Sequence, residues 1–368
     1  MTRKELNLAI FQGTTDKVLW QPRIEMWTDH HRNTDTMPDR FKGMGRFEIY
    51  DELRCSPRYN VTSGLSSWRE EEFGHRTEEI DHNHVASILE TPWGELRTVT
   101  KRVWEGDQVV NERIEEFPVS TAEGLTILTK MAETVQFKIE PNAFTESEAE
   151  QGDRAASTVM CQSDAYTDLI KSWSGLLNAC YLLADCPRQM DAYIETCHAR
   201  DDRWLAEIFN IPCSIFNLGD HTTNEFTPPP ILERYCMPRW KKISKLMTAR
   251  GRYVHSHWDG NSRHLLPYLK DSGLHAVEAL TVAPMGDMTL EGIKEAVGDQ
   301  IVVLDMIPVI YFLPNYPVGD LMDFVKRVID MFAPRLILGV SDELSAPCEI
   351  QRIDMIADLI DKTCGLAV

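Results

Sequence analysis

The sequence predicts an α/β protein, and among α/β folds a closed (β/α)8 TIM barrel with an N-terminal antiparallel β excursion fits best. Short apolar runs of strand character alternate with longer helical segments, which is the pattern of a parallel sheet covered on both faces. Polar residues gather where several of these runs stop, and a β-rich stretch interrupts the alternation near residues 75–118. An open doubly wound sheet is the competing fold. However, no predicted strand is followed by a Gly-x-Gly-x-x-Gly or a Gly-Lys-Ser/Thr loop.

The N-terminal part of the chain contains the first barrel element and the β excursion. Residues 22–27 could form a first strand whose end carries an Asp-His-His cluster, residues 29–31, that faces the cavity at the strand ends, and a solvated loop is the competing interpretation of this cluster. The apolar spacing of residues 47–53 predicts a short amphipathic helix. Residues 75–118 hold β-prone runs around Pro-Trp-Gly and Gly-Asp turns, which predicts antiparallel hairpins. A helix is expected to resume over residues 120–135.

Residues 136–368 are expected to supply the main part of the barrel, in one structural domain with the N-terminal segment, residues 1–135. The polar stretch 145–154 is interpreted as a loop, and beyond it strand-like and helical runs alternate regularly. The predicted strands are 155–161, 213–218, 253–257, 276–280, 302–304 and 335–339, and the predicted helices are 166–173, 176–183, 189–209, 238–249, 318–332 and 350–364.

Composition excludes several classes of function. The 57 acidic side chains against 38 basic ones give a formal net charge of -19, which repels phosphate backbones, so nucleic acid is not an expected partner. No apolar run approaches the roughly 18 to 20 residues that span a bilayer, so no membrane contact is expected and we expect a cytoplasmic protein. The nine cysteines include no Cys-x-x-Cys pair, which favours reduced thiols packed in the core.

The stretch 251–287 organises the chain. A predicted strand that ends in His255, His257 and Asp259 is followed by a helical segment and then by a second short strand that ends in Glu278. Side chains alternate along a strand, so the first three share one face if the strand continues that far. Adjacent parallel strands would bring His257, Asp259 and Glu278 into one space at their carboxyl ends, which is where α/β folds carry their chemistry.

This group of residues admits three interpretations. Imidazole nitrogens and carboxylate oxygens suit zinc and leave an open position for substrate. His257 and Asp259 would begin such a ligand set, and Glu278 and Asp342 could complete it. Alternatively, His257 and Asp259 act as an acid–base pair without metal, or they only hydrogen-bond the rim of the barrel.

Asp220 and His221 are two further candidates. They follow the strand predicted at residues 213–218, so they lie at the same kind of strand end. We interpret them as groups that orient substrate or handle a proton, and count them with His257 and Asp259 as catalytic candidates. A helix cap is the competing interpretation of Asp220.

The order of several short motifs resembles the uroporphyrinogen decarboxylase superfamily, and within it the cobalamin-dependent methyltransferases. The resemblance covers most of the chain and depends more on this order than on any single motif. The matching segments are Glu-Thr-Pro-Trp-Gly-Glu-Leu at 90–96, Leu-Ala-Asp-Cys-Pro at 183–187, His-Trp-Asp-Gly-Asn at 257–261, Ala-Pro-Met-Gly-Asp at 283–287 and Leu-Ile-Leu-Gly-Val-Ser-Asp at 336–342. The resemblance implies a TIM barrel whose mouth receives a methyl donor and a separate corrinoid protein.

The chain departs from the zinc motif of this family. Well-known members hold zinc with His-x-Cys-Gly-Asn and a distant Cys, whereas this chain has His-Trp-Asp-Gly-Asn at 257–261 and Asp342 near its end. Carboxylates thus replace thiolates, which suits a substrate that presents oxygen. The corrinoid signature Asp-x-His-x-x-Gly does not occur in the sequence, so cobalamin is expected on a partner protein.

The resemblance therefore implies the methyltransferase of an O-demethylase system, which moves a methyl group from a methyl ether, such as a methoxylated aromatic compound, to Co(I) of the corrinoid protein. Zinc is the expected metal, and a homodimer is reasonable for the family. A uroporphyrinogen-decarboxylase-like decarboxylase is one alternative and would be favoured by arginines that line the cavity. A non-catalytic corrinoid-protein-binding module is another and would be favoured by strand-end groups that face away from any cavity.

Overall fold

The computed structural model describes residues 1–140 and 142–365 and groups the chain into two compact units. We call them the barrel unit and the insert unit. The barrel unit comprises Met1–Ser63, Pro141–Gln162 and Pro212–Val368, and the insert unit comprises Gly64–Glu140 and Ser163–Ile211. Residues 1–135, expected as one N-terminal segment, therefore contribute to both units.

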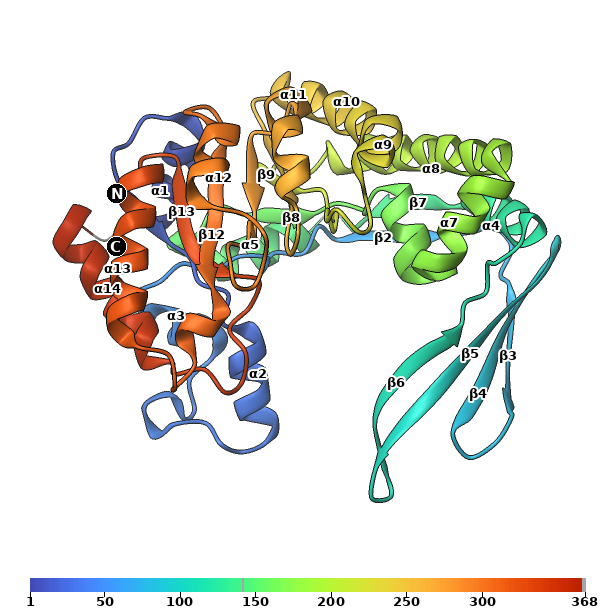
Figure 1. Cartoon of the computed structure of the whole chain (residues 1–368), viewed down its shortest axis with the longest axis horizontal. Coiled ribbons are helices and arrows are strands. Elements are labelled where there is room, and N and C mark those ends of the chain that lie inside the picture. Colours follow the sequence, from blue (N-terminus) through green and yellow to red (C-terminus); the bar gives the residue numbers. More distant parts are fainter. Residues whose placement is uncertain (141, 366–368) are drawn as a thin grey trace. The chain divides into compact units, whose positions relative to one another are not determined.

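The barrel unit is built on a parallel sheet of seven strands in the order β1-β13-β12-β11-β10-β9-β8, of which β8, β9, β12 and β13 are labelled in Figure 1. Every neighbouring pair in this sheet is parallel and the strands follow one another in chain order, which confirms the predicted α/β barrel class. The sequence predicted eight strands in a closed barrel, whereas the described residues form seven strands in which β8 does not pair with β1. The strands are β1 (Leu19–Trp20), β8 (Thr158–Met160), β9 (Ile215–Asn217), β10 (Tyr253–His257), β11 (Ala276–Glu278), β12 (Val302–Pro308) and β13 (Leu336–Ser341).

Ser56 lies in an irregular stretch and hydrogen-bonds both to strand β1 and to Arg154, which precedes β8 in the sequence. The backbone N–H of Ser56 donates to the carbonyl of Trp20 (2.9 Å), and its hydroxyl donates to the carbonyl of Arg154 (2.7 Å). Pro57 follows and has no N–H with which to extend a ladder, so the stretch does not continue as a strand. The side chain of Arg58, the next residue, is buried. The stretch therefore places a cation inside the barrel unit.

The helices of the barrel unit cover the sheet because each carries one apolar face. In α13 (Val318–Phe332) the buried residues Leu321, Val325, Val328 and Phe332 recur at helical spacing, and the helix contacts β12 and β13. The other α-helices of this unit are α1 (Arg3–Gln12), α2 (Glu25–Asn33), α3 (Arg46–Glu52), α5 (Ala143–Gln151), α9 (Pro229–Ile231), α10 (Met237–Thr248), α11 (Leu269–Ser272), α12 (Leu290–Val297) and α14 (Gln351–Cys364).

The insert unit carries the antiparallel excursion that the sequence predicts. Four strands pair in the order β3-β4-β5-β6, all antiparallel, and β2 pairs with β7 (Figure 1). The strands are β2 (Leu65–Trp68), β3 (Gly74–Glu79), β4 (His84–Thr91), β5 (Gly94–Glu105), β6 (Gln108–Glu116) and β7 (Gln136–Ile139), and the helices are α4 (Ala122–Thr134), α6 (Ala165–Asp168), α7 (Gly175–Asp185) and α8 (Pro187–Ile208). Within the described residues of both units, no helix is both long and apolar enough to cross a membrane.

Two predicted elements are wrong. No strand forms at 22–27, and residues 25–27 instead begin helix α2, because Trp27 and Thr28 bury one helical face and the Trp27 indole N–H donates to the carbonyl of Cys348 (3.1 Å). The loop expected at 145–154 is largely helix α5, since its glutamates favour helix and Phe144 is buried.

The structure predicts that Gly339→Ala destabilises the barrel unit. A Cβ at Gly339, in β13, would lie 2.6 Å from Oδ1 of Asp305 and 2.7 Å from the carbonyl oxygen of Gln21. We expect the free energy of unfolding, measured by urea titration, to fall by about 1–3 kcal/mol. Gly319→Ala is the matched control, because nothing lies within 4 Å of its Cβ position in α13. Equal stability of the two variants would contradict the close packing of Asp305 and Gln21 against Gly339.

Candidate functional site

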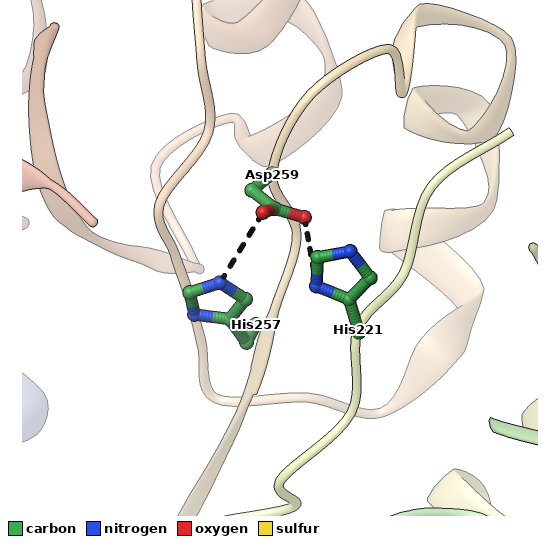
Figure 2. Close-up of side chains that lie close together, drawn as sticks. All are labelled: His221, His257 and Asp259. Carbon is green, nitrogen blue, oxygen red and sulfur yellow. Dashed lines mark ion pairs between the residues drawn. The ribbon is translucent and has the colours of Figure 1, made fainter. Parts of the chain in front are cut away.

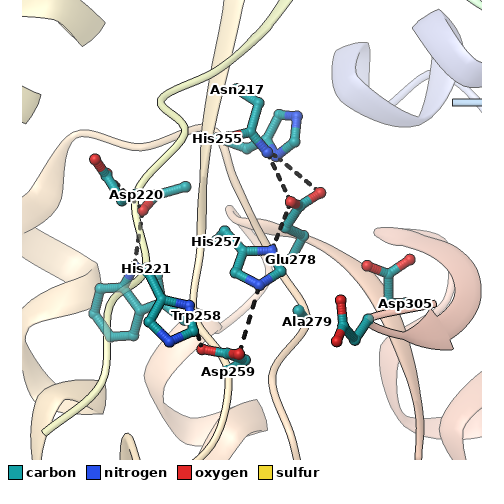
Figure 3. A network of polar contacts seen from close by, with 12 residues as sticks. Asn217, Asp220, His221, His255, His257, Trp258, Asp259, Glu278, Ala279 and Asp305 are labelled. Atoms are coloured by element: carbon teal, nitrogen blue, oxygen red, sulfur yellow. Dashed lines mark hydrogen bonds and ion pairs between the residues drawn. The ribbon is translucent and has the colours of Figure 1, made fainter. Parts of the chain in front are cut away.

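Polar side chains meet at the carboxyl ends of β9, β10 and β11. His257 ends β10 and Glu278 ends β11, and the two residues are register partners in the parallel ladder. Asn217 ends β9, and its side chain reaches the same carboxylate (Figure 3). The side chains at the ends of these neighbouring strands therefore lie close together, as expected, and Glu278 is the residue that the others contact.

The Glu278 carboxylate is buried and accepts hydrogen bonds on both oxygens. Oε1 accepts from Nδ1 of His257 (2.8 Å) and from Nδ2 of Asn217 (2.7 Å). Oε2 accepts from Nη1 of Arg58 (2.9 Å) and from the hydroxyl of Tyr59. These partners occupy both oxygens of the ionised carboxylate, so Glu278 serves as a fixed internal anion.

The charge of Glu278 is stabilised despite its burial. Burial raises the pKa of this carboxyl, but the charges and hydrogen bonds of His255, His257 and Arg58 outweigh burial and hold the pKa well below its usual range. His255 itself is fully buried, and desolvation lowers its pKa to about 4 despite the nearby Glu278. His255 therefore contributes its charge to Glu278 only near and below pH 4. At neutral pH it is neutral, and the cationic partners of Glu278 are Arg58 and His257.

Arg58 connects Glu278 with a second buried carboxylate. Its guanidinium donates to both oxygens of Asp305 (2.7 and 3.0 Å), and its Nε donates to Oε1 of Gln21 (2.8 Å). Asp305 lies within β12 with φ of +75°, a backbone conformation that is costly for a residue with a Cβ. The strain is maintained because the carboxylate is held by Arg58 in a bidentate geometry.

His257 presents its second ring nitrogen to a different carboxylate. Nε2 of His257 lies 3.8 Å from Oδ2 of Asp259, on the side of the ring opposite Glu278. Burial lowers the pKa of His257, but hydrogen bonds and charge from Asp259 and Glu278 raise it to about 10. In the protein without a metal, His257 is thus an imidazolium held between two carboxylates at neutral pH.

Asp259 brings His221 and His257 into one group (Figure 2). Oδ1 of Asp259 lies 3.2 Å from Nδ1 of His221, and one ligand atom of each of the three residues lies within 4.8 Å of the others. Oδ1 of Asp259 is buried without a hydrogen-bond partner, although its ion pair with His221 is close. The three side chains remain partly exposed, at 33%, 15% and 22% for His221, His257 and Asp259, so a small molecule can reach them.

The other two predicted site residues lie apart from this group. Asp220 is buried, and its Oδ2 accepts a hydrogen bond from the hydroxyl of Ser256 (3.0 Å), which in turn accepts from the indole of Trp258 (3.1 Å). The Asp342 carboxylate is 66% exposed and lies 3.7 Å from Nη1 of Arg23. The geometry therefore groups His221 with His257 and Asp259, where the sequence led us to expect Glu278 and Asp342.

Sequence reasoning missed Arg58, Tyr59 and Asn217, which hold Glu278 in place. Arg58 and Tyr59 belong to an irregular stretch that carries no strand or helix pattern. Asn217 offered a signal, because it is a polar residue inside the predicted strand 213–218 and Gly219 follows it. In the structure Asn217 is fully buried and donates to Glu278.

Comparison with known proteins identifies a shared fold. No family model and no curated protein matches the sequence. Among solved structures, a methyltransferase from Methanosarcina mazei is similar over 98% of this chain and 99% of its own, with a TM-score of 0.59 and 11% identity. A B12-independent methionine synthase from a Shewanella species is similar over 95% and 96%, with a TM-score of 0.41 and 9% identity. The first likeness shows that the two chains share a fold.

We predict that Arg58→Ala strongly destabilises the protein. The substitution leaves Glu278 and Asp305 buried with their main cation removed, which typically costs about 3–5 kcal/mol of unfolding free energy. Arg327→Ala is the control, because Arg327 pairs with Glu291 on the exposed surface of the same unit and should contribute less than about 1 kcal/mol. Urea unfolding of both variants makes the comparison. Similar losses of unfolding free energy in the two variants would show that the ion pairs of Arg58 with Glu278 and Asp305 are not important for stability.

Proposed function

We propose that this chain is the methyltransferase of an O-demethylase system, which transfers a methyl group from a methyl ether, such as a methoxylated aromatic compound, to Co(I) of a separate corrinoid protein. The observation that supports the proposal most is the group of His221, His257 and Asp259, which is partly exposed at the strand ends while Glu278 holds His257 from behind. The resemblance of the sequence to cobalamin-dependent methyltransferases supports the choice of reaction.

The proposed reaction has one difficult step. The bond between the methyl carbon and the ether oxygen breaks, a bond from that carbon to cobalt forms with the electron pair of Co(I), and the oxygen leaves as an alkoxide or phenoxide. Charge therefore develops on the leaving oxygen, and a group that neutralises it lowers the barrier. In the metal-free protein His257 is protonated at neutral pH and its Nε2 lies beside the partly exposed Asp259, a position from which it would donate a proton to that oxygen.

The residues also fit a zinc ion. Two imidazoles and one carboxylate are a common catalytic zinc set with an open fourth position, and bound zinc acts as a Lewis acid toward a substrate oxygen. His221, His257 and Asp259 would hold it, and Nε2 of His257 would be the ligand atom because Nδ1 donates to Glu278. A carboxylate behind a ligating histidine is the usual way to fix the orientation of the ring.

Glu278 and Asp342 are poor ligands for this ion. Both oxygens of Glu278 are already hydrogen-bonded, and a metal bond would break the contacts with His257 or Arg58. Asp342 is close to Arg23 instead. We therefore revise the proposed metal set to His221, His257 and Asp259, and assign Glu278 to the positioning of His257.

The decarboxylase alternative required arginines that are available to the carboxylates of a substrate. Arg58 is buried and already donates to Glu278, Asp305 and Gln21. Arg23 donates to Glu343 (2.5 Å). Arg58 and Arg23 are thus engaged by carboxylates of the chain itself, which favours methyl transfer over decarboxylation.

The corrinoid is proposed to belong to a partner. The corrinoid-binding signature Asp-x-His-x-x-Gly is absent from the sequence, so this chain has no counterpart of the histidine in that motif. The chain would contribute binding of the methyl donor, orientation of its ether bond and stabilisation of the leaving oxygen, while the nucleophile comes from the partner.

We predict that the purified protein contains zinc and that His257→Ala removes it. Metal content by elemental analysis should fall toward zero in His257→Ala and in Asp259→Asn, because each variant loses one of three ligands. Asp342→Asn distinguishes the two ligand sets and should keep full zinc content. His275→Ala is the control, since His275 bonds Thr248 and the backbone of Val254 away from the group. Zinc loss in Asp342→Asn would contradict the revised set.

We predict methyl transfer from at least one methyl ether. The chain would be incubated with a reduced corrinoid protein and a panel of methoxylated and methylamine donors, and formation of the methyl-cobalt product followed by absorbance. His257→Ala should lower the rate about 100-fold or more, as expected for loss of a proton donor or metal ligand, while His275→Ala should not. A flat trace across the panel with a partner of proven activity would reject the proposed reaction.

A further inference from the structure

The insert unit contains a cavity of its own. Its volume is about 200 Å³, and residues of α4, α8 and the π-helical turn η3 (Leu169–Ser174) line it. The apolar part of the wall includes Leu128, Met131 and the buried Tyr193. Pockets for drug-sized ligands begin at about 300 Å³, so this one suits a smaller molecule. π-Helical turns of this kind occur frequently at functional sites.

Arg69 lines this cavity as a cation without a counterion. Among residues 1–140 and 142–365 it forms no ion pair, and its Nε is buried without a hydrogen-bond partner. The guanidinium lies over the ring of Phe73, 5.1 Å from the centroid. Burial and the like charge of Arg200 lower the pKa of Arg69. A buried donor of this kind normally has an acceptor, so Arg69 suits the binding of an anionic group.

Arg200 adds a second guanidinium to the wall. Its ion pair with Asp201 uses Nε and Nη2, both at 2.9 Å from Oδ1 of the carboxylate. The charge of Arg200 is thus compensated inside the protein, whereas the charge of Arg69 is not. The ion pair with Asp201 uses Nε and Nη2 of Arg200, so Nη1 of Arg200 and the guanidinium of Arg69 can both receive a carboxylate of a ligand.

Asp168 gives the same cavity an unpaired negative group. Its carboxylate accepts a hydrogen bond from the hydroxyl of Ser172 (3.1 Å), and no cation among the described residues pairs with it. A phosphate dianion would be repelled by this carboxylate, whereas a ligand that carries a positive group would be attracted. The wall therefore offers one unpaired charge of each sign.

We infer that the insert unit binds an amino-acid-sized zwitterion in this cavity. Arg69 and Arg200 receive the carboxylate of the ligand, Asp168 faces its cationic group, and Leu128 and Met131 contact its apolar part. The inference uses contacts inside the insert unit alone, so it holds or fails independently of the function proposed for the barrel unit.

Isothermal titration calorimetry of the full chain tests this site. The probes are the common L-amino acids, with acetate and inorganic phosphate as ligands that carry only the anionic group. At least one amino acid should bind about tenfold or more tightly than acetate and phosphate, because only a zwitterion engages both charges. Arg69→Gln and Asp168→Asn should each weaken that binding about tenfold or more. Arg76→Gln, on exposed β3, and His257→Ala, in the barrel unit, should leave it unchanged.

Several results would overturn the inference. They are the absence of binding by every amino acid, binding of acetate or phosphate as tightly as the best amino acid, and retained affinity in Arg69→Gln or Asp168→Asn. Thermal melting shows whether each variant is folded. If a variant does not fold, the comparison of amino acids with acetate and phosphate on the wild-type chain still decides between a zwitterion site and no such site.

Discussion

The ionised carboxylate of Glu278, buried among strand ends, is the constraint on which the rest of the site depends. An isolated charge in a protein interior is strongly unfavourable, so the chain surrounds this one with donors from several distant segments. Arg58 comes from an irregular stretch before the insert, Asn217 from β9 and His257 from β10. Folding of the barrel unit and assembly of the site are therefore one event, because the anion is satisfied only when these segments have met.

The same anion determines what His257 can do. The hydrogen bond from Nδ1 to Glu278 fixes the orientation of the ring, so Nε2 points toward Asp259. Nε2 is therefore the nitrogen that would carry a proton or a metal. A proton and the proposed zinc ion would compete for this nitrogen. The metal-free and metal-bound proteins would therefore stabilise a leaving oxygen by different means from one position. The proposed ligand set of two imidazoles and one carboxylate contains no thiolate, which suits a substrate that presents oxygen.

Sequence alone could predict those features that follow from periodicity. Parallel strands end at one edge, so His257 and Glu278 could be placed together from their positions after β-prone runs. Arg58 could not, since it reaches Glu278 across 220 residues of sequence from a stretch without regular structure. Residues 145–154 were misjudged because polar composition suggested a loop, although glutamate is a good helix former. His221 was predicted from the sequence as a site residue, but only coordinates show that it shares Asp259 with His257.

The charge state of His257 tests the central claim most directly. In metal-free protein with ¹⁵N-labelled histidine, assigned by comparison with His257→Gln, the imidazole resonances should titrate near pH 10, because Glu278 and Asp259 stabilise the imidazolium more than burial disfavours it. In Glu278→Gln the midpoint should move down toward the ordinary histidine value. A midpoint near 6.5 in the wild-type protein would contradict the account, since Glu278 would then not be the anion that holds this ring.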